Sequence, residues 1–177
     1  MEAIIKEEKG LYYIVEMKLF RKTPGVVFDL YPLETIPSID AIDRVMHEKS
    51  AVSPGPVGGV IQPWYMHENQ ADHLIVMHGQ RTVHLYTKDH GKVEEFIVTP
   101  HSIMQNAKLV FEGGAVLCWP THVFHRIVSG KEGSASINLA VRFEGFDVNN
   151  NFDIYDLDTA TGDFRVIRKG YEDQFFR

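Results

Sequence analysis

Two short stretches of the sequence hold most of the side chains that could bind a metal or transfer a proton. They are PWYMHENQADHLIVMHG (residues 63–79) and GAVLCWPTHVFHRIVS (residues 114–129). Their candidate residues are Tyr65, His67, Asp72, His73, His122 and His125. Imidazole nitrogen and carboxylate oxygen are the donors that iron, manganese, nickel and zinc accept in proteins. If the fold brings the two stretches together, they can form one divalent-metal or acid–base site.

The segments around these residues have the pattern of short β-strands. From Val60 onward, apolar runs recur every 8–15 residues with turn residues between them. The runs are HLIVMHG, RTVHLY, EEFIVTP, KLVFEGG, AVLCWP, HRIVSG and ASINLAVRF. Many short strands at even spacing are typical of an all-β sandwich or barrel. We therefore predict that the strands of a barrel position the candidate residues.

Strand alternation decides which candidates share a face of the barrel wall. Residues two apart in a strand point the same way, so Tyr65 groups with His67, and Asp72 groups with Leu74. The LIVM run that follows His73 has no alternation of polar and apolar residues. The sequence therefore leaves open whether Asp72 or His73 faces the interior.

The chain has further segments on both sides of this β-rich region. In SIDAIDRVMHEK, apolar residues at 3.6-residue spacing and a capping Ser38 predict one short helix at about 38–48. The stretch SPGPVGG (53–59) then breaks regular structure. We predict an N-terminal extension (1–56) that contains strands and this helix, a barrel (57–145), and a C-terminal hairpin with a tail that packs on the barrel (146–177).

The first stretch resembles a motif of the cupin superfamily, whose fold is an RmlC-like jelly-roll barrel, or double-stranded β-helix. The cupin motif is His-x-His, three or four residues, Glu, six residues, Gly. Here Tyr65-x-His67, four residues, Asp72, six residues and Gly79 have the same spacing. The residue types match in part.

The second stretch resembles the second cupin motif, which is Gly, five residues, Pro-x-Gly, two residues, His, three residues, Asn. Here Gly114, five residues, Pro120-x-His122, two residues, His125, three residues and Ser129 have that spacing. The resemblance covers about residues 57–145. It implies an all-β fold and, because cupins with such extensions often pair through extra strands, a homodimer.

The resemblance also implies a set of metal ligands. Carried over position by position, the set is Tyr65, His67, Asp72 and His125, although tyrosine is a rare ligand and aspartate reaches one methylene less far than glutamate. His122 replaces a turn glycine and could supply the missing imidazole. His73 is the other candidate if a β-bulge shifts the strand parity.

Composition excludes several classes of partner. The net charge is −6 with no long basic block, so neither a nucleic acid nor an anionic membrane surface is an expected partner. No apolar run approaches the roughly 18–20 residues that cross a bilayer, and MEAIIKEEKG lacks the features of a signal peptide. Cys118 is the single cysteine and lies among apolar residues, which predicts a buried thiol and a cytoplasmic location.

These observations leave three functions open. The first is a cupin enzyme that processes a small molecule with a divalent metal in the barrel mouth, as a dioxygenase, isomerase or lyase, with His122 or Tyr65 as the proton-transfer residue. The second is a metal-free enzyme like the dTDP-sugar 3,5-epimerases, which GGVIQPWYMH faintly resembles. The third is a non-catalytic module that binds a sugar or another metabolite.

Overall fold

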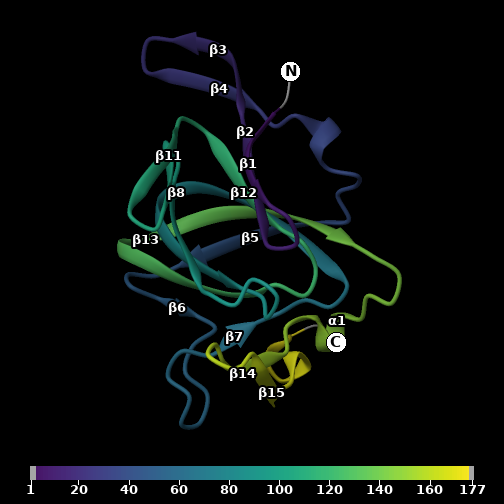
Figure 1. The fold of residues 1–177 in the computed structure, drawn as a ribbon. Coiled ribbons are helices and arrows are strands. Elements are labelled where there is room, and N and C mark those ends of the chain that lie inside the picture. The colour runs from purple at the N-terminus through teal and green to yellow at the C-terminus, as the bar shows by residue number, and fades with distance from the viewer. Residues whose placement is uncertain (1–2, 176–177) are drawn as a thin grey trace.

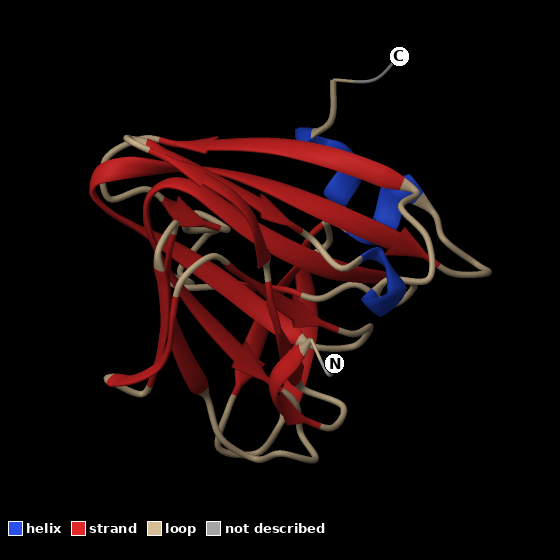
Figure 2. Ribbon diagram, turned by 90° about the horizontal axis from the view of Figure 1, so that it is seen from above, coloured by secondary structure: helices blue, strands red, loops and turns tan. Residues whose placement is uncertain are grey.

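The computed structural model describes residues 3–175. Its strands are β1 (Ile4–Glu8), β2 (Tyr12–Glu16), β3 (Lys18–Thr23), β4 (Val26–Leu30), β5 (Ala41–His47), β6 (Val52–Ser53), β7 (Trp64–Tyr65), β8 (Gln70–Tyr86), β9 (Glu94–Thr99), β10 (Ser102–Gln105), β11 (Lys108–Glu112), β12 (Ala115–Trp119), β13 (Phe124–Arg142), β14 (Ile154–Asp158) and β15 (Asp163–Arg168). Its helices are α1 (Val148–Asn151) and the 3-10 turns η1 (Leu33–Thr35) and η2 (Gly170–Asp173). The predicted all-β fold is confirmed (Figures 1 and 2).

The barrel is one continuous 13-stranded sheet that folds over on itself. Two long strands, β8 and β13, pair antiparallel to each other through both halves of the fold. The first half of β8 and the second half of β13 carry β12, β2, β1 and β5. The other halves carry β9, β10 and β11 on one side and β6, β7, β14 and β15 on the other. The two halves face each other across the interior.

The bend between the two halves depends on a glycine. Gly79 lies in β8 with a φ of +72°, and a Cβ atom there would lie 2.2 Å from the carbonyl oxygen of Gly133. Only glycine avoids both the left-handed strain and this clash. The pairing register between β8 and β13 also shifts at this point, between Ser129 and Ser134.

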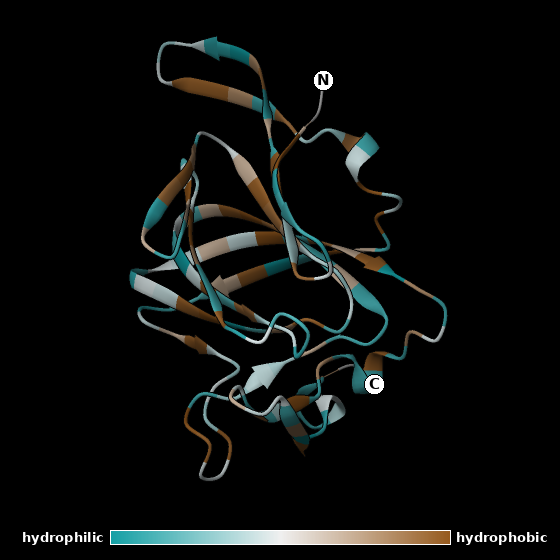
Figure 3. Cartoon of the chain, in the orientation of Figure 1, coloured by the Kyte–Doolittle hydropathy of each residue, from teal (hydrophilic) through white to brown (hydrophobic). Residues whose placement is uncertain are grey.

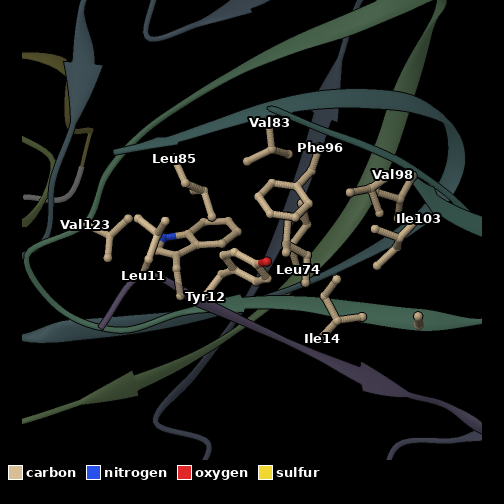
Figure 4. Close-up of a cluster of buried hydrophobic side chains, with 14 residues drawn as sticks. Leu11, Tyr12, Ile14, Leu74, Val83, Leu85, Phe96, Val98, Ile103 and Val123 are labelled. Atoms are coloured by element: carbon tan, nitrogen blue, oxygen red, sulfur yellow. The ribbon is translucent and has the colours of Figure 1, made fainter. Parts of the chain in front are cut away.

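A cluster of apolar side chains fills one part of the interior (Figure 4). Strand alternation puts every second residue of β8, β9 and β12 into this cluster. Its buried members are Leu11, Tyr12, Ile14, Leu74, Val76, Val83, Leu85, Phe96, Val98, Ile103, Ala115, Leu117, Trp119 and Val123. Most of them are less than 5% exposed, and burial of this much apolar surface is the main stabilising contribution to the fold.

The helix predicted at about 38–48 is wrong, because residues 41–47 form the strand β5. In this segment Asp43, Val45 and His47 point inward, whereas Ile42 and Met46 are 67% and 56% exposed. The apolar residues that suggested a helical stripe therefore lie on the outer face. Seven consecutive pairings with β13 stabilise the strand and outweigh the local preference. The α-helix of the described residues is α1, in the C-terminal segment.

Strands β3 and β4 form a separate two-stranded hairpin that projects from the barrel (Figure 1). Its strands carry exposed apolar side chains. Brown segments in Figure 3 mark the hydrophobic residues of β4. The most exposed are Leu19 (59%), Phe20 (68%), Val27 (56%), Phe28 (49%) and Leu30 (52%). Within the described residues, no helix has the length and apolar character needed to cross a membrane.

Candidate active site

The second part of the interior is an open cavity of about 310 Å³ rather than a packed core. It lies beside β5, β6 and β7, and polar side chains line much of it. The lining residues are Asp43, Val45, His47, Ser53, Tyr65, His67, Gln70, Asp72, Leu74, Arg81, Trp119, His125, Ile127, Ser136, Asn138 and Phe152. Leu74 and Trp119 belong to both the cavity wall and the apolar cluster, so the two parts of the interior adjoin.

Three of the predicted site residues converge in this cavity. His67, Asp72 and His125 are each at most 5% exposed, and one ligand atom from each lies within 4.8 Å of the others. His67 belongs to the loop between β7 and β8, Asp72 to β8 and His125 to β13. The stretches at residues 63–79 and 114–129 therefore meet inside the barrel.

The segment after α1 fixes the orientation of His67. The Nδ1–H of His67 donates a hydrogen bond to the backbone carbonyl of Asn151, and the ring of Phe152 packs edge-on at 5.3 Å between centroids. A carbonyl oxygen can only accept, so the proton on Nδ1 is required. Nε2 then points toward Asp72, with 3.3 Å between Nε2 and Oδ2.

His125 is held in the same way. Its Nδ1–H donates to the carbonyl of Val123 at 3.1 Å, and its ring lies 4.8 Å from that of His67 between centroids. Burial lowers the pKa of His125 to about 4, and the charge on His67 adds to the effect. His125 is therefore neutral at physiological pH and presents a free lone pair on Nε2.

Two amide side chains hold the Asp72 carboxylate. Gln70 and Asn138 each donate from their side-chain nitrogen to Oδ1, at 2.9 and 2.8 Å. Burial alone would raise the pKa of Asp72, but His67 and the hydrogen bond from Asn138 outweigh it and keep the pKa well below its usual value. The carboxylate is ionised, and Oδ2 is left to face His67.

This arrangement requires positive charge at the centre of the cluster. The Nε2 lone pair of His67 and the Oδ2 of an ionised Asp72 would repel each other at 3.3 Å if nothing lay between them. Either a proton on Nε2 or a bound cation removes the repulsion. The cluster can therefore work as an acid–base group or as a set of metal ligands.

Tyr65 lies at the edge of the cluster and not among the three converging groups. It pairs with His125 in the register between β7 and β13, and the two rings lie 5.9 Å apart. Burial raises the pKa of its hydroxyl, and the Ser53 hydroxyl offsets this only in part. Tyr65 is therefore a protonated hydroxyl that lines the cavity.

The structure does not bring the other two candidates into the cavity. Asp72 pairs with Trp119 on the inner face, whereas His73 pairs with Cys118 on the outer face, where it hydrogen-bonds the Tyr13 hydroxyl at 2.6 Å. Asp72 is thus the residue that faces the interior, and no bulge shifts the strand parity at this point.

His122 is exposed and lies outside the cavity. Its φ of +63° explains why a glycine suits this motif position, and its backbone N–H donates to the carbonyl of His67 at 2.8 Å. Its contact with the site is through the backbone. The thiol of Cys118 is buried, as predicted, behind the inner face.

Three charged or titratable cavity residues were missed by the sequence analysis, namely Asp43, His47 and Arg81. Arg81 is 1% exposed, and His47 lines the same end of the cavity. Strand alternation could have identified Arg81 as buried, because in the run RTVHLY it lies on the same face as the apolar residues Val83 and Leu85. Nothing in the sequence indicated that His47 lines the cavity, because its segment was predicted to be a helix.

Neither a scan against protein-family models nor a search of curated proteins found a match. Solved structures are similar in fold. The 3,4-ketoisomerase QdtA from Thermoanaerobacterium thermosaccharolyticum, in complex with TDP, has a TM-score of 0.54 at 13% identity, over 77% of this chain and 82% of that one. A 3,4-ketoisomerase from Helicobacter canadensis has a TM-score of 0.51 at 16% identity, over 76% and 85%.

A third similar structure is the dTDP-4-dehydrorhamnose 3,5-epimerase from Sulfolobus tokodaii, with a TM-score of 0.57 at 16% identity, over 82% of this chain and 78% of that one. At these identities the similarity concerns the fold alone. The strand order, the two long bent strands and these matches together show that the chain has the RmlC-like cupin jelly-roll fold.

Proposed function

We propose that this protein is an isomerase or epimerase that moves a proton on a carbon next to a carbonyl group of a sugar-like substrate. The observation that carries the proposal is the pairing of His67 with Asp72 beside a neutral His125. Neighbouring groups whose environments favour opposite protonation states are the arrangement that acid–base catalysis needs. The similar solved structures include two ketoisomerases and an epimerase, which supports the same class of reaction.

The roles follow from the hydrogen bonds. His125, with a free Nε2 lone pair, is the base that takes the proton from carbon. His67 carries the proton that it shares with Asp72 and donates to the carbonyl oxygen as negative charge develops there. Return of a proton to the opposite face of the same carbon gives an epimer. An isomer forms when the former carbonyl carbon takes the proton and the hydroxyl on the first carbon gives up its own proton to become the new carbonyl. Tyr65 adds a neutral donor to the same pocket.

Solvent exchange tests this proposal. Carbonyl sugars, including TDP-4-keto-6-deoxyglucose, are incubated with the protein in D₂O, and deuterium on carbon is followed by NMR. We expect incorporation by the wild type and a loss of at least about 100-fold in His125→Asn. His84→Asn, which changes a histidine outside the cavity, is the matched control. Equal exchange in wild type and His125→Asn would refute the role of the cluster.

We propose metal binding by the same cluster as a second candidate, because one observation favours it. Both histidines donate Nδ1–H to a backbone carbonyl and direct Nε2 to one point, and Asp72 keeps one free oxygen. Backbone anchoring of this kind is typical of histidines that bind a metal, and two histidines with one carboxylate are a common ligand set. When bound, a divalent ion such as iron, manganese, nickel or zinc would polarise the substrate carbonyl.

Elemental analysis of the purified protein separates the two candidates. Near-stoichiometric metal that is lost in a His67→Ala, His125→Ala double variant would support the second candidate. Full exchange activity after treatment with a chelator, with no metal detected, would support the first candidate alone.

We also propose that the chain forms a homodimer through the β3–β4 hairpin. The exposed apolar side chains of this hairpin and its unpaired edges support the proposal, since such patches are uncommon on monomers. Sedimentation velocity of the wild type and of a Phe20→Ser, Val27→Ser variant tests it. A variant that remains dimeric would refute the hairpin as the contact.

A further inference from the structure

The far end of the cavity contains a buried positive charge without a carboxylate beside it. Arg81 is 1% exposed and lines the cavity, and among residues 3–175 no Asp or Glu oxygen lies within ion-pair distance of it. Burial lowers the pKa of its guanidinium to about 10, which leaves it charged at neutral pH. A buried charge with no counter-ion is costly, so its presence calls for an explanation.

Neutral groups satisfy only part of this guanidinium. Nε donates to the Ser134 hydroxyl at 2.9 Å, and Nη2 donates to the carbonyl of Val45 at 3.1 Å. An arginine has five N–H donors, so three remain without a hydrogen bond to the described residues, both of those on Nη1 among them. Free guanidinium donors of this kind can bind a carboxylate through charge-assisted hydrogen bonds.

Other unsatisfied polar atoms lie on the same cavity wall. Among the described residues, the buried side-chain nitrogen and oxygen atoms without a hydrogen-bond partner are Trp119 Nε1 and Ser136 Oγ, and both residues line this cavity. Ser136 is opposite Val45 in the pairing of β13 with β5, so its hydroxyl lies at the Arg81 end. Buried polar atoms normally have partners, and a ligand that reached either atom would supply one.

The pairing register of β5 gives the distance between the His67 end and the Arg81 end of the cavity. Asn138 bridges Asp43 and Asp72 at the His67 end, whereas Val45 and His47 lie beside Arg81. Two to four residues of strand separate these positions, which corresponds to roughly 7–13 Å. The cavity of about 310 Å³ is at the lower end of the roughly 300–1,000 Å³ found for small-molecule sites.

We infer that the substrate is a small sugar acid, a hydroxycarbonyl compound whose carboxylate binds Arg81 and Ser136 while its carbonyl carbon lies between His67 and His125. This inference rests on the proposed function, because it assigns the reacting carbon to that cluster. A carboxylate suits this end of the cavity better than a phosphate, because Arg81 is the one lysine or arginine among the lining residues and a phosphate monoester carries nearly two negative charges at neutral pH. Asp43, the other acidic group of the wall, accepts a hydrogen bond from Asn138 rather than from Arg81.

Equilibrium binding tests the inference with three probes that differ at one position. Isothermal titration calorimetry measures D-glucuronate, D-glucose and glucose 6-phosphate against the full-length protein. We expect glucuronate to bind at least tenfold more tightly than either of the others. Equal binding of glucuronate and glucose, or tighter binding of the phosphate, would overturn the carboxylate assignment, and so would a failure of glucuronate to bind.

Variants show whether Arg81 is responsible. Arg81→Gln should weaken glucuronate binding at least tenfold, and Arg81→Lys should recover part of the loss. Arg126→Gln, which changes a half-buried arginine outside the cavity, is the matched control and should bind as the wild type does. If Arg81→Gln does not fold, Ser136→Ala should still weaken binding several-fold without loss of structure. Unchanged affinity in every folded Arg81 and Ser136 variant would overturn the inference.

The same probes separate this inference from the proposed function. His125→Asn should lose proton exchange and keep glucuronate binding, because it leaves the Arg81 end intact. Arg81-dependent glucuronate binding without exchange on any substrate would support the inference and refute the proposed function. Exchange on neutral keto sugars, with no Arg81-dependent binding of glucuronate, would support the proposed function and refute the inference.

Discussion

The two parts of the barrel interior are built from the same strands and differ in what they contain. In β8, Val83 and Leu85 enter the apolar cluster, whereas Asp72 and Arg81 enter the cavity, and all four are buried. The apolar part is filled, and its burial stabilises the fold. The cavity places ionised groups in the interior and leaves space beside them. A filled core would be more stable than a cavity with buried charged groups, and the binding and chemistry that we propose would account for this difference.

The largest effect on stability is expected from the apolar part. Phe96 is fully buried and packs edge-on against Tyr12, with 4.7 Å between ring centroids. Phe96→Ala should lower the free energy of unfolding by about 3–5 kcal/mol, as measured by urea denaturation. Phe143→Ala, at a residue that is 48% exposed, should change it by less than about 1 kcal/mol. A small effect at Phe96 would mean that the core is less tightly packed than the structure shows.

The next effect is expected from Asp72→Asn, which keeps the shape of the side chain but removes its charge. It leaves the His67 proton without its counter-charge and disturbs the hydrogen bonds from Gln70 and Asn138. We expect a loss of unfolding free energy of about 1–3 kcal/mol, together with a loss of exchange activity of about 100-fold or more. Full activity in a folded Asp72→Asn protein would contradict the role assigned to the pair.

A pH effect should follow from the Arg81 end of the cavity. Burial and the charge of Arg81 lower the pKa of His47 from 6.5 to about 4. Between these values the unfolded chain binds a proton that the folded chain does not, so stability is present above pH 6.5 and is lost as the pH falls toward 4. Because His47 is only partly buried, its contribution should be on the order of 1–2 kcal/mol.

Denaturation midpoints measured from pH 7 to pH 4 check this expectation. His47→Asn should reduce the dependence of stability on pH across this window, whereas His101→Asn, at an exposed histidine, should leave it unchanged. Identical profiles for the wild type and His47→Asn would show that His47 is protonated as easily in the folded protein as in the unfolded chain.

The smallest effect compares two serines in β13. Ser134 Oγ accepts a hydrogen bond from Arg81 Nε and shares another with the Ser129 hydroxyl, whereas Ser136 Oγ has no partner among the described residues. Ser134→Ala should therefore cost about 1 kcal/mol of unfolding free energy. Ser136→Ala should leave stability unchanged or raise it by up to about 1 kcal/mol in the absence of ligand. Equal losses in the two variants would indicate that Ser136 has a structural partner.

Much of the barrel could be predicted from the sequence, because strand runs and turn residues are local signals. The segment at 38–48 was mispredicted because a short run of mixed residues fits both the helical and the strand period, and only the distant β13 decides between them. The spacing of the two motifs pointed to His67, Asp72 and His125. It also suggested His122, which a left-handed turn leaves at the surface.

The rest of the site depends on information that spacing does not contain. Whether Asp72 or His73 faces inward is decided by the pairing with β12. The partners of His67 and Gln70 come from Asn151, which follows the barrel in the chain and belongs to no motif. Arg81 lies on the same strand face as buried residues. Because an arginine in a strand is usually exposed, its residue type predicted a surface position rather than the buried one.

The bond between His67 and Asn151 has a consequence for how the protein is made. The two residues are 84 positions apart, and Asn151 is translated after β13, the last strand to supply a residue of the cluster. A nascent chain that has emerged only as far as β13 has a histidine whose ring can still rotate and whose tautomer is not fixed. The acid–base arrangement that we propose for the cavity is therefore complete only once the segment that contains α1 has been made and packs against the barrel.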